Sequence, residues 1–355
     1  MNKVKITTTV HIIGTVGLPA CYGGFETLVE NLVQEDSNQN FLVYCSSKHY
    51  ENRQEFYNGA KLVYIPLSAN GAQSVFYDIF SMIKSIFNKP DVVLILGVSG
   101  CVFLPLFRFL SNSKVITNID GLEWKRDKWG TLARKFLKLS EKIAVRNSDV
   151  IISDNKAIAD YVMEEYSVES EVIAYGGDHA LHCKLELRDD DYAFALCRIE
   201  PENNVELILE AFSRTTQKIK FVGNWKNSQF GMDMVKRFSI FDNIELIDPI
   251  YDQSTLHKLR SSCSFYVHGH SAGGTNPSLV EMMHFEKNIF CFNCSYNIET
   301  TKNSTLYFST VDELVDLINT ENELDLGVTL RKIAESDYTW LNIRNKYYDL
   351  FSKGK

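Results

Sequence analysis

Short apolar runs typical of β-strands alternate with helix-like segments along the whole chain, and this alternation constrains the fold more than any other feature. In the first half, strands are predicted at residues 10–16, 41–45, 61–65, 92–96, 115–119, 149–153 and 171–174, with helices at 25–34, 75–87, 129–146 and 157–165. A second series has strands at 192–197, 219–223, 244–247, 265–268, 290–292 and 306–308, and a helix at 311–318. Such alternation predicts an α/β protein with doubly wound parallel sheets. We expect two domains, at residues 1–178 and 179–337, and a C-terminal helix at 338–355 that packs back on the first domain.

The stretch HGHSAGGTNPSLVE, residues 268–281, reads as the end of a strand, a tight loop and the start of a helix. Its glycines free the loop backbone, Pro277 suits the first helical position, and Asn276 suits the N-cap before it. Free amides at a helix N-terminus attract an anion, and phosphate is the first candidate. Glu281, just over one turn further on, is placed to hydrogen-bond a diol such as a ribose edge. The alternative is a plain strand-to-helix connection.

Two further strand ends carry candidate ligand contacts. Arg198 follows a predicted strand, and Pro201 opens a helix after it, so the guanidinium is placed to pair with phosphate oxygens. The alternative for this arginine is a surface ion pair. Gly23 and Gly24 precede the first helix, with Glu26 in its first turn, and form a second candidate contact for an anion or a sugar. The glycine spacing differs from the dinucleotide fingerprint, so NAD is not supported.

Asp120 follows the strand predicted at 115–119 and begins a charged segment, DGLEWKR. Side chains at the carboxyl end of a parallel strand are placed for chemistry, although an aspartate there is also a common helix cap. We assign four residues to the side of the protein that meets an acceptor or a membrane, namely Glu26, Lys125, Arg126 and Lys128.

The region around this segment is basic, because residues 108–146 hold ten Lys and Arg against four Asp and Glu. The helix predicted at 129–146 separates its basic residues from its apolar face. A solvated helix face is one interpretation. The other is contact with an anionic membrane surface or with a pyrophosphate-linked acceptor, consistent with the neighbouring Trp124 and Trp129.

Composition narrows the class of protein. The 355 residues, 45% of them hydrophobic, can bury more than one core, while a formal net charge of −8 argues against nucleic-acid binding. The eight cysteines are scattered through apolar runs, as reduced intracellular thiols are, and the lone CFNC pair at 291–294 does not predict a metal site.

Two stretches of the sequence bear on where the protein is located in the cell. The N-terminal segment does not resemble a secretion signal, so a cytoplasmic location is expected. The apolar run at 92–107 is slightly short for a membrane span and is broken by Gly97, Gly100 and Pro105. It predicts a buried parallel strand, a turn and a helix start.

Several separated motifs resemble, in their order along the chain, the retaining glycosyltransferases of family 4. They are GGFE at 23–26, YGGD at 175–178, CRIEPENNVELILEAF at 197–212 and the glycine loop that ends at Glu281. More narrowly, PACYGGFETLVENL, NIDGLEWKRDKWG and HGHSAGGTNPSLVE are similar to a bacterial subgroup that includes β-1,4-rhamnosyltransferases of surface-polysaccharide assembly. The resemblance covers nearly the whole chain. It implies the GT-B architecture, in which two Rossmann-like domains face each other across a cleft, the C-terminal one holding a nucleotide sugar and the N-terminal one the acceptor.

The resemblance also implies roles for individual residues. Arg198 would bind the pyrophosphate and Glu281 the ribose hydroxyls, while Asp120 would orient the acceptor or stabilise positive charge on the sugar. Asp120 and Arg198 are thus the catalytic candidates. The remaining donor-binding candidates are Gly23, Gly24, Asn203, Ile250, His270, Gly273, Gly274, Thr275 and Asn276. Ile250 lies in the loop at 248–251, where the family holds the base. No metal and no cofactor are implied.

Three departures from the family pattern concern the donor side and the active site. The family usually has a lysine five residues after the arginine, where this chain has Asn203. The first of two glutamates separated by seven residues is replaced by Gly273, which suggests a different donor sugar, such as a deoxy sugar. The usual active-site histidine is not evident, and Asp120 stands near its place.

The function implied by the resemblance is retaining transfer of L-rhamnose from dTDP-L-rhamnose onto a lipid-linked saccharide, in the synthesis of capsule, O-antigen or another surface polysaccharide. Such an enzyme would be cytoplasmic and associated with the inner face of the cell membrane. Other interpretations are a transferase that uses a UDP- or GDP-sugar, a nucleotide-sugar epimerase, and a non-catalytic sugar-binding protein. An inverting transferase would need a general base, for which Asp120 and His11 are candidates.

Overall fold

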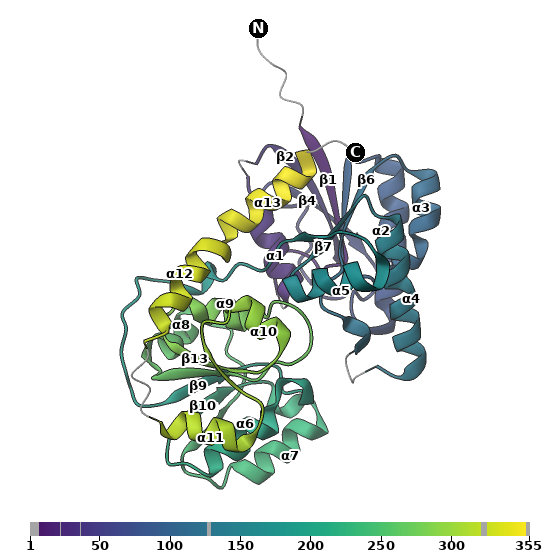
Figure 1. Ribbon diagram of the computed structural model, residues 1–355. Coiled ribbons are helices and arrows are strands. Elements are labelled where there is room, and N and C mark those ends of the chain that lie inside the picture. The colour runs from purple at the N-terminus through teal and green to yellow at the C-terminus, as the bar shows by residue number, and fades with distance from the viewer. Residues whose placement is uncertain (1–6, 22, 36, 126–128, 321–324, 353–355) are drawn as a thin grey trace. The chain divides into compact units, whose positions relative to one another are not determined.

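A computed structural model of the protein describes residues 7–21, 23–35, 37–125, 129–320 and 325–352. The chain divides into two compact units, whose helices and strands are labelled in Figure 1. The first unit comprises Met1–Ile173 together with Leu341–Lys355, and the second comprises Ala174–Trp340. The chain passes from the first unit to the second after Ile173, a few residues before the boundary expected at 178. It returns to the first unit after Trp340, just after the boundary expected at 337.

The first unit is built on one sheet whose described strands follow the order β3-β4-β2-β1-β5-β6-β7-β8. Neighbouring strands pair in parallel except β3 and β4. The strands are β1 (Thr8–Ile13), β2 (Gln39–Ser46), β3 (Phe56–Tyr57), β4 (Ala60–Ile65), β5 (Val92–Leu96), β6 (Lys114–Asn118), β7 (Val150–Ser153) and β8 (Glu171–Val172). The doubly wound sheet predicted from the alternation is confirmed.

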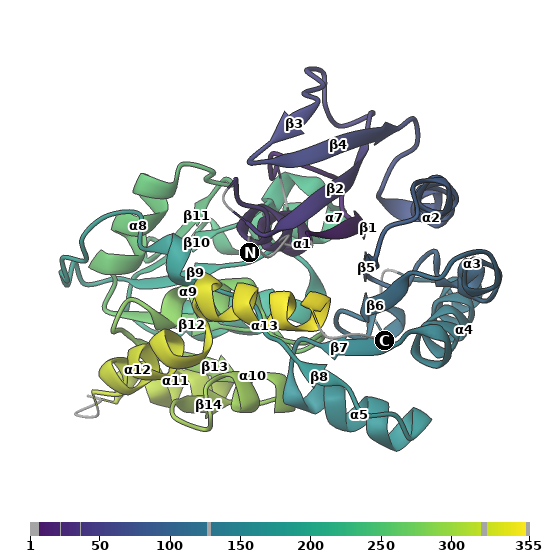
Figure 2. The ribbon, with the colours of Figure 1, turned by 90° about the horizontal axis from the view of Figure 1, so that it is seen from above.

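Helices cover both faces of this sheet, as right-handed crossovers require when the strand order reverses. They are α1 (Gly24–Leu32), α2 (Ser74–Asn88), α3 (Leu104–Leu110), α4 (Thr131–Asn147), α5 (Lys156–Tyr166) and α13 (Trp340–Ser352), with 3-10 turns at Gly71–Gln73, Cys101–Phe103 and Glu123–Lys125. Figure 2 shows α2, α3 and α4 together on one side of the sheet and α1 and α13 on the other. The apolar run at 92–107 forms β5, a 3-10 turn and the start of α3, as predicted.

The C-terminal helix α13 belongs to the first unit through specific contacts. The Lys114 ammonium donates to the carbonyl oxygen of Leu350 at 2.8 Å, and the Asn118 side-chain amide donates to the Tyr347 hydroxyl at 2.9 Å. Tyr347 is fully buried. These contacts tie the last helix to β6, near the centre of the first sheet.

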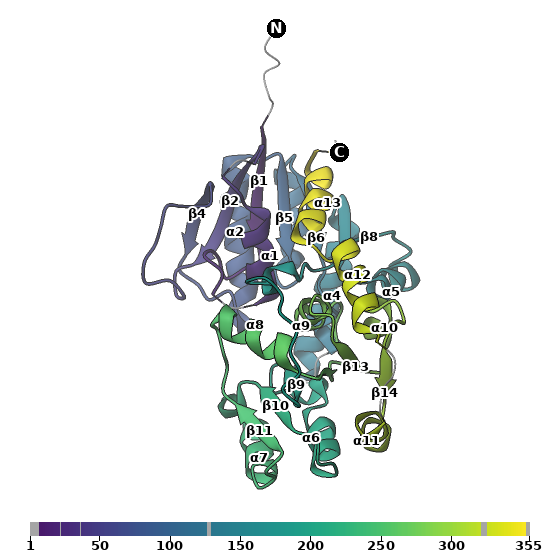
Figure 3. The same ribbon diagram turned by 90° about the vertical axis from the view of Figure 1, so that its left-hand side faces the viewer.

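The second unit is built on a parallel sheet whose described strands follow the order β11-β10-β9-β12-β13-β14. They are β9 (Ala193–Leu196), β10 (Ile219–Val222), β11 (Ile244–Ile247), β12 (Phe265–His268), β13 (Asn288–Phe292) and β14 (Leu306–Phe308). The helices are α6 (Val205–Ser213), α7 (Gln229–Phe238), α8 (Gln253–Ser262), α9 (Pro277–Met283), α10 (Ser295–Thr300), α11 (Val311–Asn319) and α12 (Gly327–Asp337). Short 3-10 turns lie at Asp178–Ala180, Pro201–Asn203 and Trp225–Asn227. Figure 3 shows α6, α7 and α11 on one side of this sheet and α8 and α9 on the other.

Both faces of the second sheet are buried. Since successive strand residues point to opposite faces, one strand contributes side chains to both cores. In β9, Ala193 and Ala195 pack with α6 and α7 in one core, whereas Phe194 packs with α9 in the other. One sequence prediction is wrong here: Pro201 opens only a 3-10 turn, and α6 begins at Val205 after Asn204, which adopts a left-handed conformation with φ +49°.

Each sheet has one point at which its strand order reverses. This point lies between β1 and β5 in the first unit and between β9 and β12 in the second. Parallel sheets bind ligands outside the carboxyl ends of their strands at such points, because the adjoining loops diverge there. The loop that carries Arg198 follows β9, and the glycine loop follows β12, so both flank the reversal of the second sheet.

Candidate functional site

The loops after β9 and β12 are hydrogen-bonded to each other in the second unit. Ser271 donates from its backbone N–H and from its hydroxyl to the carbonyl oxygen of Glu202, at 2.9 and 2.8 Å. The Asn204 side-chain amide donates to the carbonyl oxygen of Gly269 at 2.7 Å. The two loops therefore form one rigid edge at the reversal of the sheet, which the sequence alone did not join.

Asn203 is a central part of this edge. It is 5% exposed, its amide nitrogen donates to the carbonyl oxygen of Arg198 at 2.7 Å, and its Oδ1 lies 2.8 Å from His270 Nδ1. Because an amide oxygen only accepts, His270 must carry a proton on Nδ1. Asn203 thus holds the backbone of Arg198 to the glycine loop, and its side chain is occupied within the protein.

Arg198 stands at the carboxyl end of β9 with its side chain exposed. Among the residues that the structure describes, its guanidinium forms no ion pair and no hydrogen bond. The alternative interpretation as a surface ion pair therefore has no described partner. Its backbone is fixed by Asn203 while its charge remains available to an anion.

The glycine loop leads into α9 as predicted. Asn276 is the N-cap, its side chain accepts from the backbone N–H of Ser278 at 3.0 Å, and Pro277 is the first helical residue. Gly274 and Thr275 are buried just before this cap. The cap uses the Asn276 side chain, so any role of this residue in binding phosphate falls to its backbone amide.

Gly273 has a structural reason to be glycine. Its φ is +123°, a conformation that side chains rarely adopt, and a Cβ there would lie 3.2 Å from His270 Nε2. A glutamate, which the resemblance implies at this place, would be strained in the present loop conformation. Glycine at position 273 therefore permits this backbone conformation as well as leaving the position without a carboxylate.

We expect Gly273→Glu to destabilise the loop by about 1–3 kcal/mol because it forces a non-glycine residue into a sparsely populated conformation. Hydrogen–deuterium exchange of the segment at 269–283 measures the effect, and Ala272→Glu provides the matched control with the same charge one residue earlier. Equal protection in the two variants would show that the backbone at Gly273 is not constrained.

Glu281 lies in α9 and is held by two charged or polar partners. Its Oε2 forms an ion pair with Arg260 of α8, whose side chain is 2% exposed, and its Oε1 lies 3.4 Å from His179 Nε2. Burial raises the pKa of this carboxyl, but Arg260 and His179 outweigh burial and hold the pKa below its usual value. The carboxylate is therefore ionised, and since each of its oxygens can accept more than one hydrogen bond, a diol can still be bound.

His179 is oriented by Trp340, the last residue of the second unit. The Trp340 indole N–H, which can only donate, lies 2.9 Å from His179 Nδ1. Nδ1 is therefore the acceptor, and the ring proton is on Nε2, facing Glu281. The sequence offered no signal for these contacts, because Trp340 and Glu281 are 161 and 102 residues away from His179 along the chain.

The YGGD motif places His179 against α9. A Cβ at Gly177 would lie 2.5 Å from the carbonyl oxygen of Val280, so the backbone can pass close to the helix only with glycine there. Asp178 accepts from the backbone N–H of Trp340 at 2.8 Å, and the Tyr175 and Trp340 rings pack edge to face with centroids 4.8 Å apart. The motif thus positions Glu281 through His179.

The loop expected to hold the base follows β11, the edge strand of the second sheet. Ile250 is partly buried against the α8–α9 core, Tyr251 is 71% exposed, and Asp248 forms an ion pair with Lys226 at 2.6 Å. The loop thus offers an apolar side chain next to an exposed aromatic ring.

In the first unit, the residues after β1 form a compact turn. Gly23 is the N-cap of α1, which begins at Gly24. Glu26 is 6% exposed and accepts hydrogen bonds from the Thr15 hydroxyl at 2.9 Å and from the Val16 N–H at 2.6 Å. Burial raises the pKa of Glu26, against the opposing effect of these bonds. Its carboxylate is thus engaged within the turn and not exposed, and the assignment of Glu26 to the acceptor or membrane side stays a prediction.

Asp120 lies just after β6 in a left-handed conformation with φ +61°, and its N–H donates to Asn118 Oδ1 at 2.9 Å. It does not cap α4, whose N-cap is Gly130. Strain of this kind in a non-glycine residue is common at functional sites. Lys125 is exposed, and Arg126 and Lys128 lie outside the described residues.

Two further observations concern candidate residues of the first unit. Trp124 and Trp129 direct their indole N–H groups at Glu141 and Glu123, both at 3.0 Å, so their polar ends hold the segment together. His11 is 1% exposed in β1 and lies 3.0 Å from the Ser85 hydroxyl near the end of α2. Burial lowers the pKa of His11 to about 4, and the ring has no access for a general base.

Asp78 in α2 is a buried acid that the sequence did not single out. Its Oδ2 accepts from the Ser99 hydroxyl and from the Gly100 N–H, the latter at 3.2 Å, in the loop after β5. Burial raises the pKa of Asp78 to about 7, against the opposing effect of these hydrogen bonds. A single aspartate within an amphipathic helix gives no pattern by which it could have been found.

The described residues contain no group of three or more His, Cys, Asp or Glu side chains placed to hold a metal ion. The eight cysteines are free thiols. Over the same described residues, every helix is too short or too polar to cross a membrane.

Comparison with known proteins extends the description. Residues 7–178 match the model of a protein family described as a domain of unknown function, DUF1972. No match to a curated protein sequence was found. Sucrose-phosphate synthase from Thermosynechococcus elongatus is similar in structure, with a TM-score of 0.78, 13% sequence identity and coverage of 97% of this chain and 98% of that one. HepE from Anabaena in complex with UDP and glucose has a TM-score of 0.73 and 12% identity, covering 98% of this chain and 100% of that one. A glycosyltransferase from Rickettsia africae has a TM-score of 0.71 and 11% identity, covering 98% of each chain.

These similarities cover both units and establish the fold. The chain has the GT-B glycosyltransferase architecture of two Rossmann-like units, as the sequence motifs implied. A fold hosts more than one chemistry, so the reaction has to be argued from the site.

Proposed function

We propose that the protein is a hexosyltransferase that uses a nucleotide diphosphate sugar as its donor. The observation that carries this proposal is Arg198, an exposed guanidinium without a described partner, fixed beside a glycine loop and a helix N-terminus at the reversal of the second sheet. A guanidinium beside backbone amides at a helix N-terminus suits a diphosphate. Glu281, ionised and held one turn into α9, suits the ribose hydroxyls.

In the proposed reaction, the bond between the anomeric carbon and the diphosphate oxygen breaks, and the acceptor hydroxyl bonds to that carbon on the same face. The hydroxyl proton passes to the leaving diphosphate, so no protein nucleophile is needed. Arg198 and the loop amides stabilise the charge that develops on the leaving group, an electrostatic contribution that exceeds most others in such sites. Asp120 orients the acceptor or stabilises positive charge on the sugar.

For the donor we propose dTDP-L-rhamnose first, because Gly273 stands where the resemblance to family 4 implies a glutamate that contacts sugar hydroxyls. The acceptor proposed is a lipid-linked saccharide in surface-polysaccharide synthesis. A UDP-sugar is the second candidate, since HepE, a protein of similar fold, was crystallised with UDP and glucose.

A thermal-shift panel of dTDP-, UDP- and GDP-sugars tests the donor, because a ligand that binds the folded state raises its melting temperature by mass action. We expect dTDP-L-rhamnose and dTDP to give the largest shifts. A shift with UDP- or GDP-sugars alone would remove rhamnose from the proposal, and no shift with any of them would remove the nucleotide-sugar donor.

Incubation of the donor without acceptor separates a transferase from an epimerase of the same fold. We expect the sugar to remain unchanged when the products are followed by NMR. Interconversion of epimers would contradict the proposal, and the anomer formed with acceptor present would distinguish retention from inversion.

We expect Trp340→Phe to weaken nucleotide binding about fivefold. The variant loses one hydrogen bond, worth about 1 kcal/mol, so His179 is no longer held in the tautomer whose Nε2–H faces Glu281. Isothermal titration calorimetry with the nucleotide measures the change. The matched control is Trp225→Phe, which also removes an indole hydrogen bond, at 3.0 Å to Ile247, but does not contact His179 or Glu281. Equal affinities in the two variants would contradict the role of His179.

A further inference from the structure

Exposed large apolar side chains are concentrated on three helices of the first unit. Of the seventeen such residues in the described chain, eight lie on α2, α3 and α4: Phe76, Phe80, Phe87, Leu106, Phe109, Leu110, Leu132 and Leu139. Phe87 is 80% exposed and Phe109 is 85% exposed. Scattered exposed residues are ordinary, but a concentration on neighbouring helices marks an interaction surface. These three helices lie side by side in Figures 1 and 2.

The apolar residues occupy the outward stripe of each helix, where a solvated helix carries polar residues. On α2 the stripe runs through Phe76, Phe80, Lys84 and Phe87, at helical spacing. On α4, apolar and basic residues alternate along the stripe in the order Leu132, Lys135, Leu139, Lys142 and Arg146.

The basic residues of α4 surround a hollow of about 340 Å³, which is lined by Lys135, Lys138, Leu139, Lys142, Arg146, Glu165 and Tyr166. Lys138 is engaged there by Glu165 at 3.3 Å and by Glu141 at 3.4 Å. Lys135, Lys142 and Arg146 are exposed and form no ion pair within the described part of the chain.

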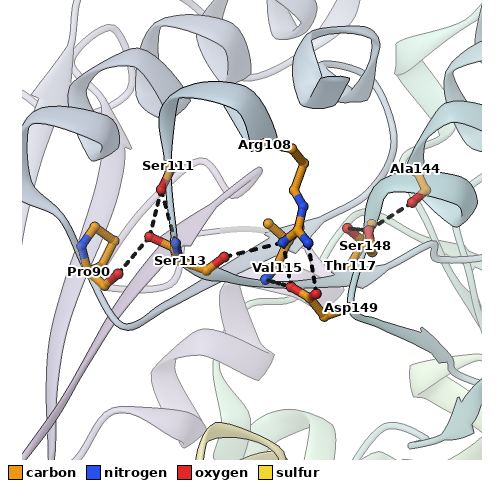
Figure 4. Close-up of polar contacts among 9 residues, drawn as sticks. All are labelled: Pro90, Arg108, Ser111, Ser113, Val115, Thr117, Ala144, Ser148 and Asp149. Carbon is orange, nitrogen blue, oxygen red and sulfur yellow. Dashed lines mark hydrogen bonds and ion pairs between the residues drawn. The ribbon is translucent and has the colours of Figure 1, made fainter. Parts of the chain in front are cut away.

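The acidic residues of these helices do not reach the surface. Every residue of α2, α3 and α4 is described, and their carboxylates are Asp78 and Glu141, which are 3% and 2% exposed. Arg108 of α3 is neutralised by Asp149, with Nη1 to Oδ2 at 2.6 Å and Nη2 to Oδ1 at 3.0 Å, as Figure 4 shows. The surface therefore joins unpaired positive charge to aromatic and aliphatic side chains, without exposed negative charge from its own helices.

We propose that the outward surface of α2, α3 and α4 docks on an anionic lipid bilayer. Phenylalanine and leucine would enter the boundary between headgroups and acyl chains, while Lys135, Lys142 and Arg146 meet lipid phosphates. The inference goes beyond the proposed reaction and does not depend on it, because it is carried by the composition of a surface whose residues all belong to the first unit.

Self-association through the same surface is disfavoured by charge. In a twofold symmetric contact the same patch meets itself, so the basic residues of α4 would face one another. An anionic bilayer can pair with the basic residues and bury the apolar side chains at the same time.

Flotation with vesicles of phosphatidylcholine alone, and of phosphatidylcholine mixed with phosphatidylglycerol, tests the charged part of the proposal. We expect binding to the anionic vesicles only. The triple variant Lys135→Gln, Lys142→Gln, Arg146→Gln should lower that binding about a hundredfold, since each basic residue near the surface contributes about fivefold. The matched control Lys61→Gln, Lys236→Gln, Lys332→Gln removes the same charge from exposed positions on other elements and should bind as the unaltered protein does.

The triple variant Phe76→Ser, Phe80→Ser, Phe87→Ser tests the apolar part and should lower binding at least about tenfold. Its control is Phe56→Ser, at a phenylalanine that is 58% exposed on β3. Binding of neutral and anionic vesicles alike, or retention of binding in both triple variants, would overturn the proposal. A dimer in light scattering that the phenylalanine variant abolishes, without vesicle binding, would assign the surface to self-association and overturn it as well.

Discussion

Replacement of Arg198 by alanine should lower the rate of sugar transfer about 10²–10³-fold, the cost of removing one preorganised group that stabilises developing charge. The guanidinium is exposed, and within the described chain it has no partner, so its loss should change the free energy of unfolding by no more than about 0.5 kcal/mol. Single-turnover transfer, with the donor identified by thermal shift, measures the first effect, and urea unfolding measures the second.

Two variants make this result specific. Arg198→Lys keeps the charge but not the planar pair of donors, and it should recover only part of the rate. Arg237→Ala removes another exposed arginine, which belongs to α7 and pairs with Glu206 of α6, and should leave the rate unchanged. A normal rate in Arg198→Ala would refute the assignment of this residue to the leaving diphosphate.

Replacement of Glu281 by alanine should affect stability and binding together. Arg260 would remain buried without its partner, and breaking a buried ion pair from one side costs about 3–5 kcal/mol. We expect hydrogen–deuterium exchange in α8 and α9 to accelerate accordingly, and nucleotide binding to be lost. Loss of activity in this variant therefore does not by itself establish contact with the ribose.

The double variant Glu281→Leu with Arg260→Met separates the two roles. Apolar residues of similar volume often replace a buried ion pair without loss of stability, so protection of α8 and α9 should return while nucleotide binding stays lost. If the double variant bound the nucleotide normally, Glu281 would be a structural residue and the ribose contact would have to lie elsewhere.

The glycine loop illustrates how local features can be predicted from the sequence. Asn276 and Pro277 specify a helix start by chemistry that acts within a few residues, an N-cap acceptor and a fixed φ. The strands can be predicted from the sequence for a similar reason, because burial on both faces of a parallel sheet requires continuous apolar runs. The start of α6 was misplaced, since Pro201 also suits a 3-10 turn and the left-handed Asn204 gives no distinct pattern.

Asn203 and Glu26 show what residue type and spacing leave open. A position in a functional motif suggested contact with a ligand, but their side chains are hydrogen-bonded within the protein to Arg198, His270, Thr15 and Val16. Residue type and spacing cannot distinguish a polar group that binds a ligand from one that holds a loop, because both need hydrogen-bond partners.

The sequence by itself determined the α/β class, the alternation of elements, the helix start at Asn276 and the candidate residues at strand ends, because each depends on periodicity or on neighbours in the chain. Only the tertiary structure decided that the loops after β9 and β12 are joined, that Trp340 fixes the proton of His179 toward Glu281, and that the exposed stripes of α2, α3 and α4 lie side by side. These features depend on which strands become neighbours and on which side of a helix remains uncovered. Both are set by the packing of segments far apart in the chain, which no local pattern encodes.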